Sequence, residues 1–353
     1  MRVPADRILL VLFGAIGDVV RALPLAQRLR AGYPRAHLAW AVEPAAAPLL
    51  AGHPALDARL VFDRAGGARA LLRFCREIRR QHFDLTLDLQ RHAKSGLVSV
   101  ASGAPVRIGF HRRNAKELNW LCNTHTIDPV EPRGWKLEQY QRFADLLELP
   151  NGPLRFDITL TPAEEARVEA LLAPRTRPFA GLFLGSTWES RRWFPASFAR
   201  IVEALDTRGL DAVLLGGGDT TAIAAEIAAL TGCPVRDLTA RTTLRETYGV
   251  LARARLALGP DSGPMHLAAA AGTPVVSLWG ATTPARSAPY GSEDLVLVGR
   301  VPCAPCYRRE CPIDRWCMQT LTPARVLAPI ARVLDGRTDR ASAGSERSLR
   351  GEQ

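Results

Sequence analysis

Short hydrophobic runs alternate with longer amphipathic stretches along the first half of the chain. The runs predict strands, and the stretches between them predict helices. The predicted strands are 7–13, 36–42, 59–62, 85–89 and 107–110, and the predicted helices include 68–80 and 94–102. Strands separated by helices indicate βαβ crossovers and a parallel sheet that is covered on both faces. Pro24 predicts that the helix after the first strand is short or kinked.

The same alternation restarts after the turn segment 150–153. It predicts strands at 179–184, 211–215, 255–258 and 274–278, with helices at 195–205, 220–230, 265–271 and 322–334. We therefore expect an α/β fold of two doubly wound units, with domains at 1–160 and 175–335 and a disordered polar tail at 336–353. Such units bind ligands at the carboxyl ends of their strands, so two facing units enclose a cleft.

The composition is that of a globular protein. The chain has 353 residues, of which 47% are hydrophobic and 23% charged, so bulk disorder and fibrous architectures are poor interpretations. No apolar run approaches the roughly 20 residues that cross a bilayer. The run 8–16 ends at Gly17-Asp18 without a cleavage site, so we expect that it is not a signal peptide. We expect a cytoplasmic protein without a membrane span.

The charge balance predicts an anionic partner. Arginine and lysine number 46 against 35 acidic residues, which gives a net charge of +11 and favours a nucleic acid, a membrane surface or a phosphorylated substrate. Only Lys94, Lys116 and Lys136 are lysines. Such one-sided arginine usage often reflects genomic base composition, so we assign it little mechanistic weight. The seven cysteines are an odd count, and we expect no secretion signal, so a disulfide framework is disfavoured.

A glycine turn and a carboxylate follow the first predicted strand. Gly14 and Gly17 bracket the turn, and Asp18 stands at the opening of the next helix. The spacing does not match the G-x-G-x-x-G dinucleotide fingerprint. Asp18 is either a helix cap, a common place for aspartate, or a general base that faces the cleft.

The stretch from Leu258 to Gly280 is the most informative one. A strand leads to Asp261, and Ser262 and Gly263 leave backbone N–H groups free at a helix start. Free amides and the positive end of a helix dipole form an anion site that suits a diphosphate. His266, on the first turn of that helix, either contacts a ligand or is a satisfied buried histidine.

Two further strand ends carry polar groups. Ser186 and Thr187 supply hydroxyls, and Arg191 and Arg192 supply a guanidinium that neutralises phosphate oxygens. The glycines 216–218 precede Asp219, and an acid at such a position commonly hydrogen-bonds a ribose.

These stretches together resemble glycosyltransferase family 9, the ADP-heptose:lipopolysaccharide heptosyltransferases. The resemblance rests on Ile16-Gly17-Asp18 with Leu23-Pro24, Trp188, Arg192-Trp193-Phe194-Pro195, Gly216-Gly217-Gly218-Asp219 and, above all, Asp261 to Ala269, and it extends from about residue 7 to 335. It implies the GT-B architecture, in which two Rossmann-like domains face a central cleft. The N-terminal domain would bind the acceptor and the C-terminal domain the nucleotide sugar. It also implies an inverting single displacement that needs no metal and no cofactor.

The resemblance also implies roles for individual residues. Asp18 would deprotonate the acceptor hydroxyl, and Asp261 would hold hydroxyls of the donor sugar. The diphosphate would lie on Ser186, Thr187, Arg192 and the amides of Ser262 and Gly263, with Asp219 and His266 completing the donor site. The family usually has lysine where this chain has Arg192, and Phe194 intervenes before the proline, so Arg191 remains an alternative to Arg192.

The acceptor implied by the resemblance is the anionic, Kdo-containing inner core of lipopolysaccharide on lipid A. We expect Gly17, Arg91, Lys94, Arg112 and Arg113 to contact it, since the charged ones follow strand ends of the first domain. The net positive charge is consistent with peripheral contact at the cytoplasmic face of the inner membrane. The sequence leaves open whether the acceptor sugar is Kdo, the first heptose or a later core sugar.

Other functions remain as alternatives. A GT-B enzyme with another nucleotide sugar and another glycan acceptor would share the fold. A sugar-nucleotide-binding protein without turnover would share the donor site. A nucleic-acid binder is disfavoured because the basic residues are dispersed and the strand-end acids would repel a polyanion.

Four cysteines lie close together in sequence near the C-terminal end, namely Cys303, Cys306, Cys311 and Cys317. They form either a metal site or a loop of reduced thiols, since only the first pair has zinc-knuckle spacing.

Overall fold

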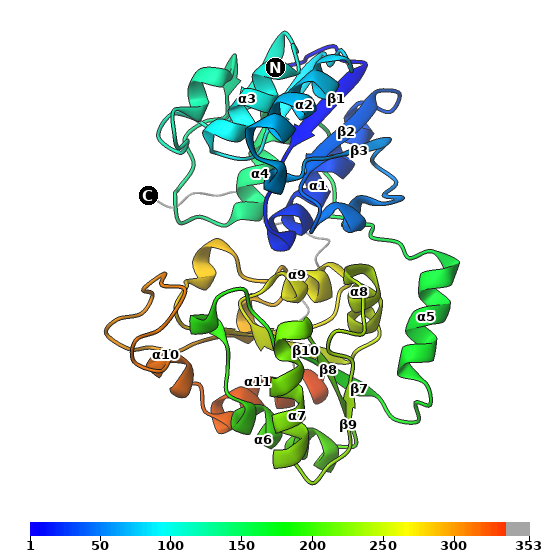
Figure 1. Cartoon of the computed structure of the whole chain (residues 1–353), viewed down its shortest axis with the longest axis vertical. Helices are drawn as coiled ribbons and strands as arrows, with labels where there is room; N and C mark the ends of the chain where they lie inside the picture. The colour runs from blue at the N-terminus through cyan, green and yellow to red at the C-terminus, as the bar shows by residue number, and fades with distance from the viewer. Residues whose placement is uncertain (337–353) are drawn as a thin grey trace.

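The computed structural model describes residues 1–336 and shows two lobes, each built on a six-stranded parallel sheet (Figure 1). The tail predicted at 336–353 lies outside the described residues except for Gly336. In the first lobe the strand order is β3-β2-β1-β4-β5-β6, and in the second it is β12-β11-β10-β7-β8-β9. The two orders are the same topology, since β7 to β12 correspond in sequence to β1 to β6. This is the order of a Rossmann-type sheet.

The first lobe contains six strands and four α-helices. The strands are β1 Arg7–Val11, β2 His37–Val42, β3 Ala58–Val61, β4 Leu85–Asp88, β5 Val106–Gly109 and β6 His125–Thr126. The helices are α1 Ile16–Gly32, α2 Gly67–Arg79, α3 Ala93–Ala101 and α4 Lys136–Leu146, with short 3₁₀ turns that include η1 Ala47–Leu50 and η3 Asn119–Cys122. The central strands are buried on both faces, which explains their uninterrupted hydrophobic sequences.

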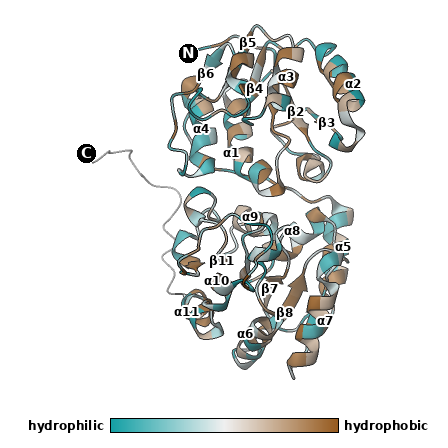
Figure 2. Cartoon of the chain, turned by 60° about the vertical axis from the view of Figure 1, so that its left-hand side comes forward, coloured by the Kyte–Doolittle hydropathy of each residue, from teal (hydrophilic) through white to brown (hydrophobic). Residues whose placement is uncertain are grey.

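The second lobe repeats this arrangement. Its strands are β7 Phe179–Phe183, β8 Asp211–Leu215, β9 Val235–Asp237, β10 Leu256–Pro260, β11 Val275–Trp279 and β12 Val296–Val298. Its helices are α5 Pro162–Leu172, α6 Pro195–Thr207, α7 Thr221–Leu230, α8 Leu244–Ala252, α9 Gly263–Ala270, α10 Trp316–Gln319 and α11 Pro323–Leu334. Strands of both lobes are predominantly hydrophobic, and the helices carry polar outer faces (Figure 2).

The opening helix differs from its prediction. α1 continues through Pro24 for 17 residues and is therefore not short. Proline cannot donate to the carbonyl four residues earlier, which usually breaks a helix. Here Leu23, Pro24 and Leu25 are all buried in the core of the first lobe, and this packing outweighs the lost hydrogen bond.

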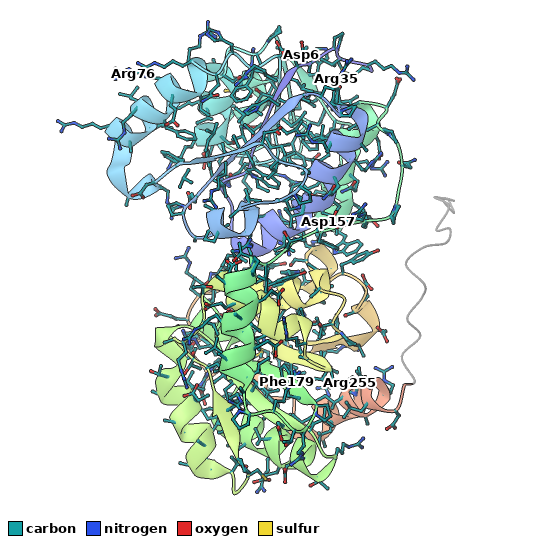
Figure 3. The ribbon with its side chains drawn as sticks, turned by 90° about the vertical axis from the view of Figure 1, so that its right-hand side faces the viewer. Asp6, Arg35, Arg76, Asp157, Phe179 and Arg255 are labelled. Carbon is teal, nitrogen blue, oxygen red and sulfur yellow. The ribbon has the colours of Figure 1, made fainter. Side chains whose placement is uncertain are left out.

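The two lobes are joined by one segment and by a shared core. The chain crosses through residues 150–161, on which Figure 3 labels Asp157 near the junction. One hydrophobic cluster contains buried side chains of both lobes, among them Leu23 of α1 and Met265 of α9. No helix within residues 1–336 is long and apolar enough to cross a membrane.

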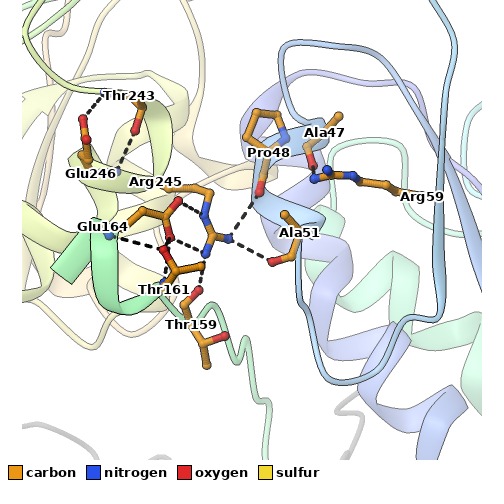
Figure 4. A network of polar contacts seen from close by, with 10 residues as sticks. All are labelled: Ala47, Pro48, Ala51, Arg59, Thr159, Thr161, Glu164, Thr243, Arg245 and Glu246. Atoms are coloured by element: carbon orange, nitrogen blue, oxygen red, sulfur yellow. Dashed lines mark hydrogen bonds and ion pairs between the residues drawn. The ribbon is translucent and has the colours of Figure 1, made fainter. Parts of the chain in front are cut away.

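A buried arginine reinforces the junction (Figure 4). Arg245 of α8 pairs with Glu164 of α5 at 2.6 Å and donates to the carbonyl of Thr159 in the connecting segment. Its remaining N–H groups reach the first lobe, where they donate to the carbonyls of Pro48 and Ala51. One guanidinium thus links the second lobe, the connecting segment and the first lobe.

Candidate active site

Asp18 lies on the first turn of α1, directly after β1. Its carboxylate accepts hydrogen bonds from Lys136 Nζ at 2.6 Å and from Arg21 Nη2 at 2.5 Å. The residue at the N-cap is Ala15, and it makes no side-chain cap. The helix-cap interpretation of Asp18 is therefore wrong. Burial would raise the pKa of Asp18, but the charges of Lys136 and Arg21 outweigh burial and hold this pKa well below its usual value.

Asp18 lines a pocket of about 110 Å³ at the carboxyl ends of β1 and β4. This is the switch point of the first sheet, where open α/β sheets bind ligands. The lining residues are Leu12, Gly14, Asp18, Leu89, Gln90, Arg91, His92, Phe110, Lys116, Lys136, Gln139, Tyr140 and Arg286. Four of them are Arg or Lys, and Asp18 is the one carboxylate among them. The pocket therefore has a cationic lining that suits an anionic ligand.

Arg91 is the predicted acceptor residue that the structure brings to this pocket beside Asp18. Its guanidinium lies over the Phe110 ring, 4.0 Å from the centroid, and donates to the Gln139 side chain. Burial and the neighbouring charge of Arg286 lower the pKa of Arg91 to about 10. Arg91 thus stays charged near neutral pH while it carries no carboxylate partner within the described residues.

Asp261 lies at the matching position of the second sheet, where β10 ends beside β7. Its carboxylate accepts from Thr282 Oγ1 at 2.7 Å and pairs with Arg191 Nη1 at 3.1 Å. Ser186 Oγ donates to the Asp261 carbonyl at 3.1 Å. Arg191 also lies over the Trp188 ring, 3.9 Å from its centroid. The segments that follow β7, β10 and β11 therefore meet at Asp261.

Arg191 and Arg192 point to different partners. Arg192 pairs with Asp219 and donates to the Ser186 carbonyl at 3.3 Å. Arg191, by contrast, faces Asp261. The geometry therefore places the guanidinium of Arg191, the alternative left by the sequence, closest to the Asp261 carboxylate.

The helix start after Asp261 packs directly on the first lobe. Ser262 is the N-cap of α9, and its Oγ is buried without a hydrogen-bond partner. A Cβ built on Gly263 would lie 2.9 Å from Ile16 Cβ, so glycine permits the close approach of α9 to α1. The two switch points therefore lie beside each other.

His266 and Arg21 connect the two candidate sites. Arg21 Nη1 donates to His266 Nε2 at 2.6 Å, and the same guanidinium pairs with Asp18. Burial, with the Arg21 charge, lowers the pKa of His266 well below its ordinary value, so the imidazole is neutral. His266 is a buried histidine with a satisfied Nε2, as one of its two interpretations predicted. Its side chain also faces Gly17, whose Cβ position lies 2.6 Å from His266 Cδ2.

Other predicted acceptor residues do not line the pocket. Lys94 Nζ lies 5.7 Å from the centroid of the Phe62 ring, and Arg112 and Arg113 are exposed. Conversely, Lys136 and Arg286 line the pocket although no sequence motif pointed to either of them. For Lys136, the sequence signal that could have been used is the rarity of lysine in this arginine-rich chain. Two of the three lysines, Lys116 and Lys136, line the pocket.

The cysteine-bearing segment supports the loop that carries Arg191. Ser190 N donates to the Arg309 carbonyl at 3.0 Å, and Ser190 Oγ donates to the Arg308 carbonyl at 2.6 Å. Arg315 pairs with Glu189 at 3.0 Å. In the part of the chain that the structure describes, no group of three or more histidine, cysteine or acidic side chains is arranged to hold a metal ion.

Comparisons with known proteins agree with this architecture. Residues 71–317 match glycosyltransferase family 9 (heptosyltransferase). The chain is 28% identical over 320 residues to lipopolysaccharide heptosyltransferase 1 of Pseudomonas aeruginosa, covering 86% of this chain and 87% of the relative. It is 24% identical over 286 residues to the lipopolysaccharide core heptosyltransferase OpsX of Haemophilus influenzae, covering 80% and 81%.

Solved structures show the same fold. A glycosyl transferase family 9 protein from Veillonella parvula superimposes with a TM-score of 0.84 at 19% identity, covering 94% of this chain and 98% of that one. ADP-heptose lps heptosyltransferase II of E. coli gives a TM-score of 0.75 at 22% identity, covering 94% and 100%. The fold is thus the GT-B architecture predicted from the sequence. From its family match and its relatives, the chain is a glycosyltransferase that belongs to family 9, the heptosyltransferases.

Proposed function

We propose that the protein transfers a heptose from ADP-heptose to the anionic inner core of lipopolysaccharide. The observation that carries this proposal is the adjacency of Asp18, in a cationic pocket of the first lobe, to the α9 helix start of the second lobe. The relatives support the choice of substrates, since they are named as lipopolysaccharide heptosyltransferases. A structural neighbour, the E. coli heptosyltransferase WaaC, was solved with ADP.

The proposed chemistry is a single displacement with Asp18 as general base. An acceptor hydroxyl in the pocket passes its proton to the Asp18 carboxylate as its oxygen attacks the anomeric carbon of the donor. The bond from that carbon to the diphosphate oxygen breaks, and the electron pair leaves with ADP. Attack from the side opposite the diphosphate inverts the anomeric configuration. Asp18 is ionised throughout the ordinary pH range, as a base must be before it accepts a proton.

The donor is proposed to lie along the second lobe. Asp261 would accept hydrogen bonds from the sugar hydroxyls, and Asp219 from the ribose. The diphosphate would be held by side chains and amides of the two strand ends, namely Ser186, Thr187, Arg191, Arg192, Ser262 and Gly263, with His266 at the edge of the site. Guanidinium groups and amides stabilise the charge that develops on the leaving diphosphate, so the proposed step requires no metal ion.

The acceptor proposal includes contact with the cytoplasmic face of the inner membrane. Helices α2 and α3 and the turn η3 pack side by side on the first lobe. We call their outer side the α2–α3 face. Its exposed residues include Arg69, Arg73, Arg76, Leu97, Val100, Leu118 and Leu121, and Figure 3 labels Arg76. Cationic and apolar groups together suit an anionic bilayer.

A transfer assay tests the proposed reaction. The purified protein is incubated with ADP-heptose and with lipopolysaccharide cores truncated at Kdo or at the first heptose, and mass spectrometry detects the gain of one heptose. Asp18→Asn should abolish the gain while it leaves ADP binding intact. NMR of the product tests the inversion, and added EDTA tests the independence from metal. Retained configuration or loss of activity in EDTA would contradict those two parts of the proposal.

Binding of nucleotide diphosphates tests the donor. At a ligand concentration of 100 Kd, a true ligand stabilises the fold by about 2.7 kcal/mol. ADP should therefore raise the melting temperature more than UDP or GDP does. A larger shift with UDP or GDP would instead favour the alternative, a GT-B enzyme with another nucleotide sugar and glycan acceptor.

A further inference from the structure

The pocket around Asp18 contains one residue of the opposite lobe. Arg286 ends the short turn Pro284–Arg286 that follows β11, and it lines the pocket together with residues of the first lobe only. Its loop is fastened to the first lobe at Trp135. The indole Nε1 of Trp135 donates to the Ala288 carbonyl at 3.2 Å, and the Trp135 and Tyr290 rings stack at 5.8 Å and 14°. Trp135 directly precedes Lys136, so one interlobe contact positions both cations.

The charges of Arg91 and Arg286 are uncompensated. Within residues 1–336, Arg286 makes no ion pair, and its Nε is buried without a hydrogen-bond partner. The polar partner of the Arg91 guanidinium is the neutral amide of Gln139. The pocket carboxylate of Asp18 is already held by Lys136 and Arg21. Two guanidinium groups of the same sign thus approach each other from two lobes, which costs free energy unless an anion lies between them.

We propose that Arg91 and Arg286 together hold one carboxylate or phosphate group of the acceptor, so that a residue of the donor lobe selects the acceptor. This inference rests on the proposed function. A planar guanidinium suits bidentate binding of either anion. The anion is assigned to the acceptor because Asp18, which receives the acceptor's proton, lines the same pocket. The donor's diphosphate is proposed to lie on two other arginines, Arg191 and Arg192, which pair with Asp261 and Asp219 in the structure.

A group that contacts both lobes couples acceptor binding to lobe closure. Since the anion meets both guanidinium groups only when the lobes are together, it binds the closed state more tightly than an open one. Coupling of this kind is reciprocal, so the acceptor raises the affinity for ADP by the same factor by which ADP raises the affinity for the acceptor. Arg286 is then the residue through which the coupling acts.

Steady-state kinetics of Arg286→Gln test the proposal. We expect the KM for the acidic acceptor to rise about 10- to 100-fold, the range of a lost charge-assisted hydrogen bond, with the KM for the donor unchanged. Arg286→Lys keeps the charge but loses the bidentate geometry of the guanidinium, so its KM for the acceptor should lie between those of the wild type and Arg286→Gln. With an acceptor whose acidic group is methyl-esterified, the wild type and Arg286→Gln should have equal kinetics. Arg300→Gln, an exposed arginine of the same lobe, is the matched control.

Two kinetic outcomes would overturn the proposal. A raised KM for the donor with the esterified acceptor assigns Arg286 to the diphosphate instead. Unchanged kinetics in Arg286→Gln show that the residue binds neither substrate. Melting temperature and ADP binding of each variant verify that it is folded.

Calorimetry with inorganic phosphate separates this proposal from the proposed function. Phosphate should bind the wild type with a measurable heat. This binding heat should disappear in Arg91→Gln and in Arg286→Gln, and it should persist in Arg191→Gln. That pattern in a protein that transfers no heptose would reject the proposed function and retain the anion site. Phosphate binding that depends on Arg191 alone would reject the anion site.

Discussion

The imidazole of His266, in the second lobe, accepts a hydrogen bond of 2.6 Å from the guanidinium of Arg21, in the first. The same guanidinium pairs with Asp18. A single side chain therefore connects the proposed base to the helix start that is proposed to bind the diphosphate. The position of the base depends on how the two lobes meet.

Gly17→Ala tests this dependence. A Cβ at position 17 would lie 2.6 Å from His266 Cδ2, a distance at which one of the two must move. We expect the lobes to separate, the Arg21–His266 bond to be lost and kcat/KM to fall by about tenfold or more, which corresponds to about 1.4 kcal/mol. Gly152→Ala meets no atom within 4 Å and should have wild-type kinetics. Wild-type kinetics in Gly17→Ala would show that the contact is dispensable.

Lys136→Gln should change the pH profile. The Lys136 charge lowers the pKa of Asp18, whereas burial raises it. Removal of Lys136 therefore raises this pKa, and the carboxylate becomes protonated at a higher pH. We expect the acidic limb of the kcat profile to move to higher pH in Lys136→Gln relative to the wild type. Lys116→Gln removes a pocket charge without an ion pair to Asp18 and should leave that limb in place. An unshifted limb in Lys136→Gln contradicts the assignment of Asp18 as the titrating base.

Much of the fold was predictable because the buried strands have uninterrupted apolar sequences. β10 and β11 were predicted within two residues of their observed ends, and Asp261 was predicted because it follows β10. Strands β6, β9 and β12 were missed, since each has two or three residues and no buried one, and so offers no buried hydrophobic run. Helices α4, α5 and α8 were also not predicted.

The site residues Lys136 and Arg286 were not predicted for a different reason. Lys136 is 118 residues from Asp18 in sequence, and Arg286 comes from the other lobe. Hydrophobic periodicity reports which face of an element is buried but not which loops meet across an interface. Asp18 and Arg91 could be selected because strand ends of a doubly wound sheet are known ligand positions. No such rule selects Lys136, which follows a long loop of the first lobe, or Arg286, whose loop belongs to the other lobe.

Asp88→Asn should change how stability depends on pH. Burial raises the pKa of Asp88 to about 7, although Ser95 and Asn119 donate hydrogen bonds to it. A carboxyl whose folded pKa exceeds its unfolded value stabilises the fold below the unfolded pKa, and this contribution is lost as the pH rises through about 7. Urea unfolding between pH 4 and 8 should therefore show a smaller decline of stability with pH in Asp88→Asn than in the wild type. Parallel curves would mean that Asp88 does not titrate in this range.

Arg245→Ala should weaken the junction between the lobes. The variant removes the donor of the carbonyls of Pro48, Ala51 and Thr159 and the arginine partner of Glu164, which keeps its hydrogen bonds from Thr161. We expect a loss of about 1–3 kcal/mol in the free energy of unfolding, which is the usual cost of leaving buried polar groups unsatisfied. The loss stays in this range because Glu164 is partly exposed and can hydrogen-bond to water instead. Urea denaturation measures the loss, and Arg241→Ala, an exposed neighbour, serves as the control. Equal stability of the two variants would show that the network contributes nothing.

The α2–α3 face should bind anionic lipid. Leu118 and Leu121 are 66% and 61% exposed, and they follow Lys116, which lines the Asp18 pocket. A lipid-linked acceptor would reach that pocket most directly if these side chains entered the bilayer. The double variant Leu118→Ser/Leu121→Ser should sediment less with vesicles that contain phosphatidylglycerol, while transfer to a delipidated acceptor stays unchanged. Leu230→Ser changes an exposed leucine of the second lobe and should bind like the wild type. Because arginines contribute to the attraction, binding should also weaken with salt and be absent on phosphatidylcholine. Equal sedimentation of the double variant and Leu230→Ser would show that Leu118 and Leu121 do not contact the membrane.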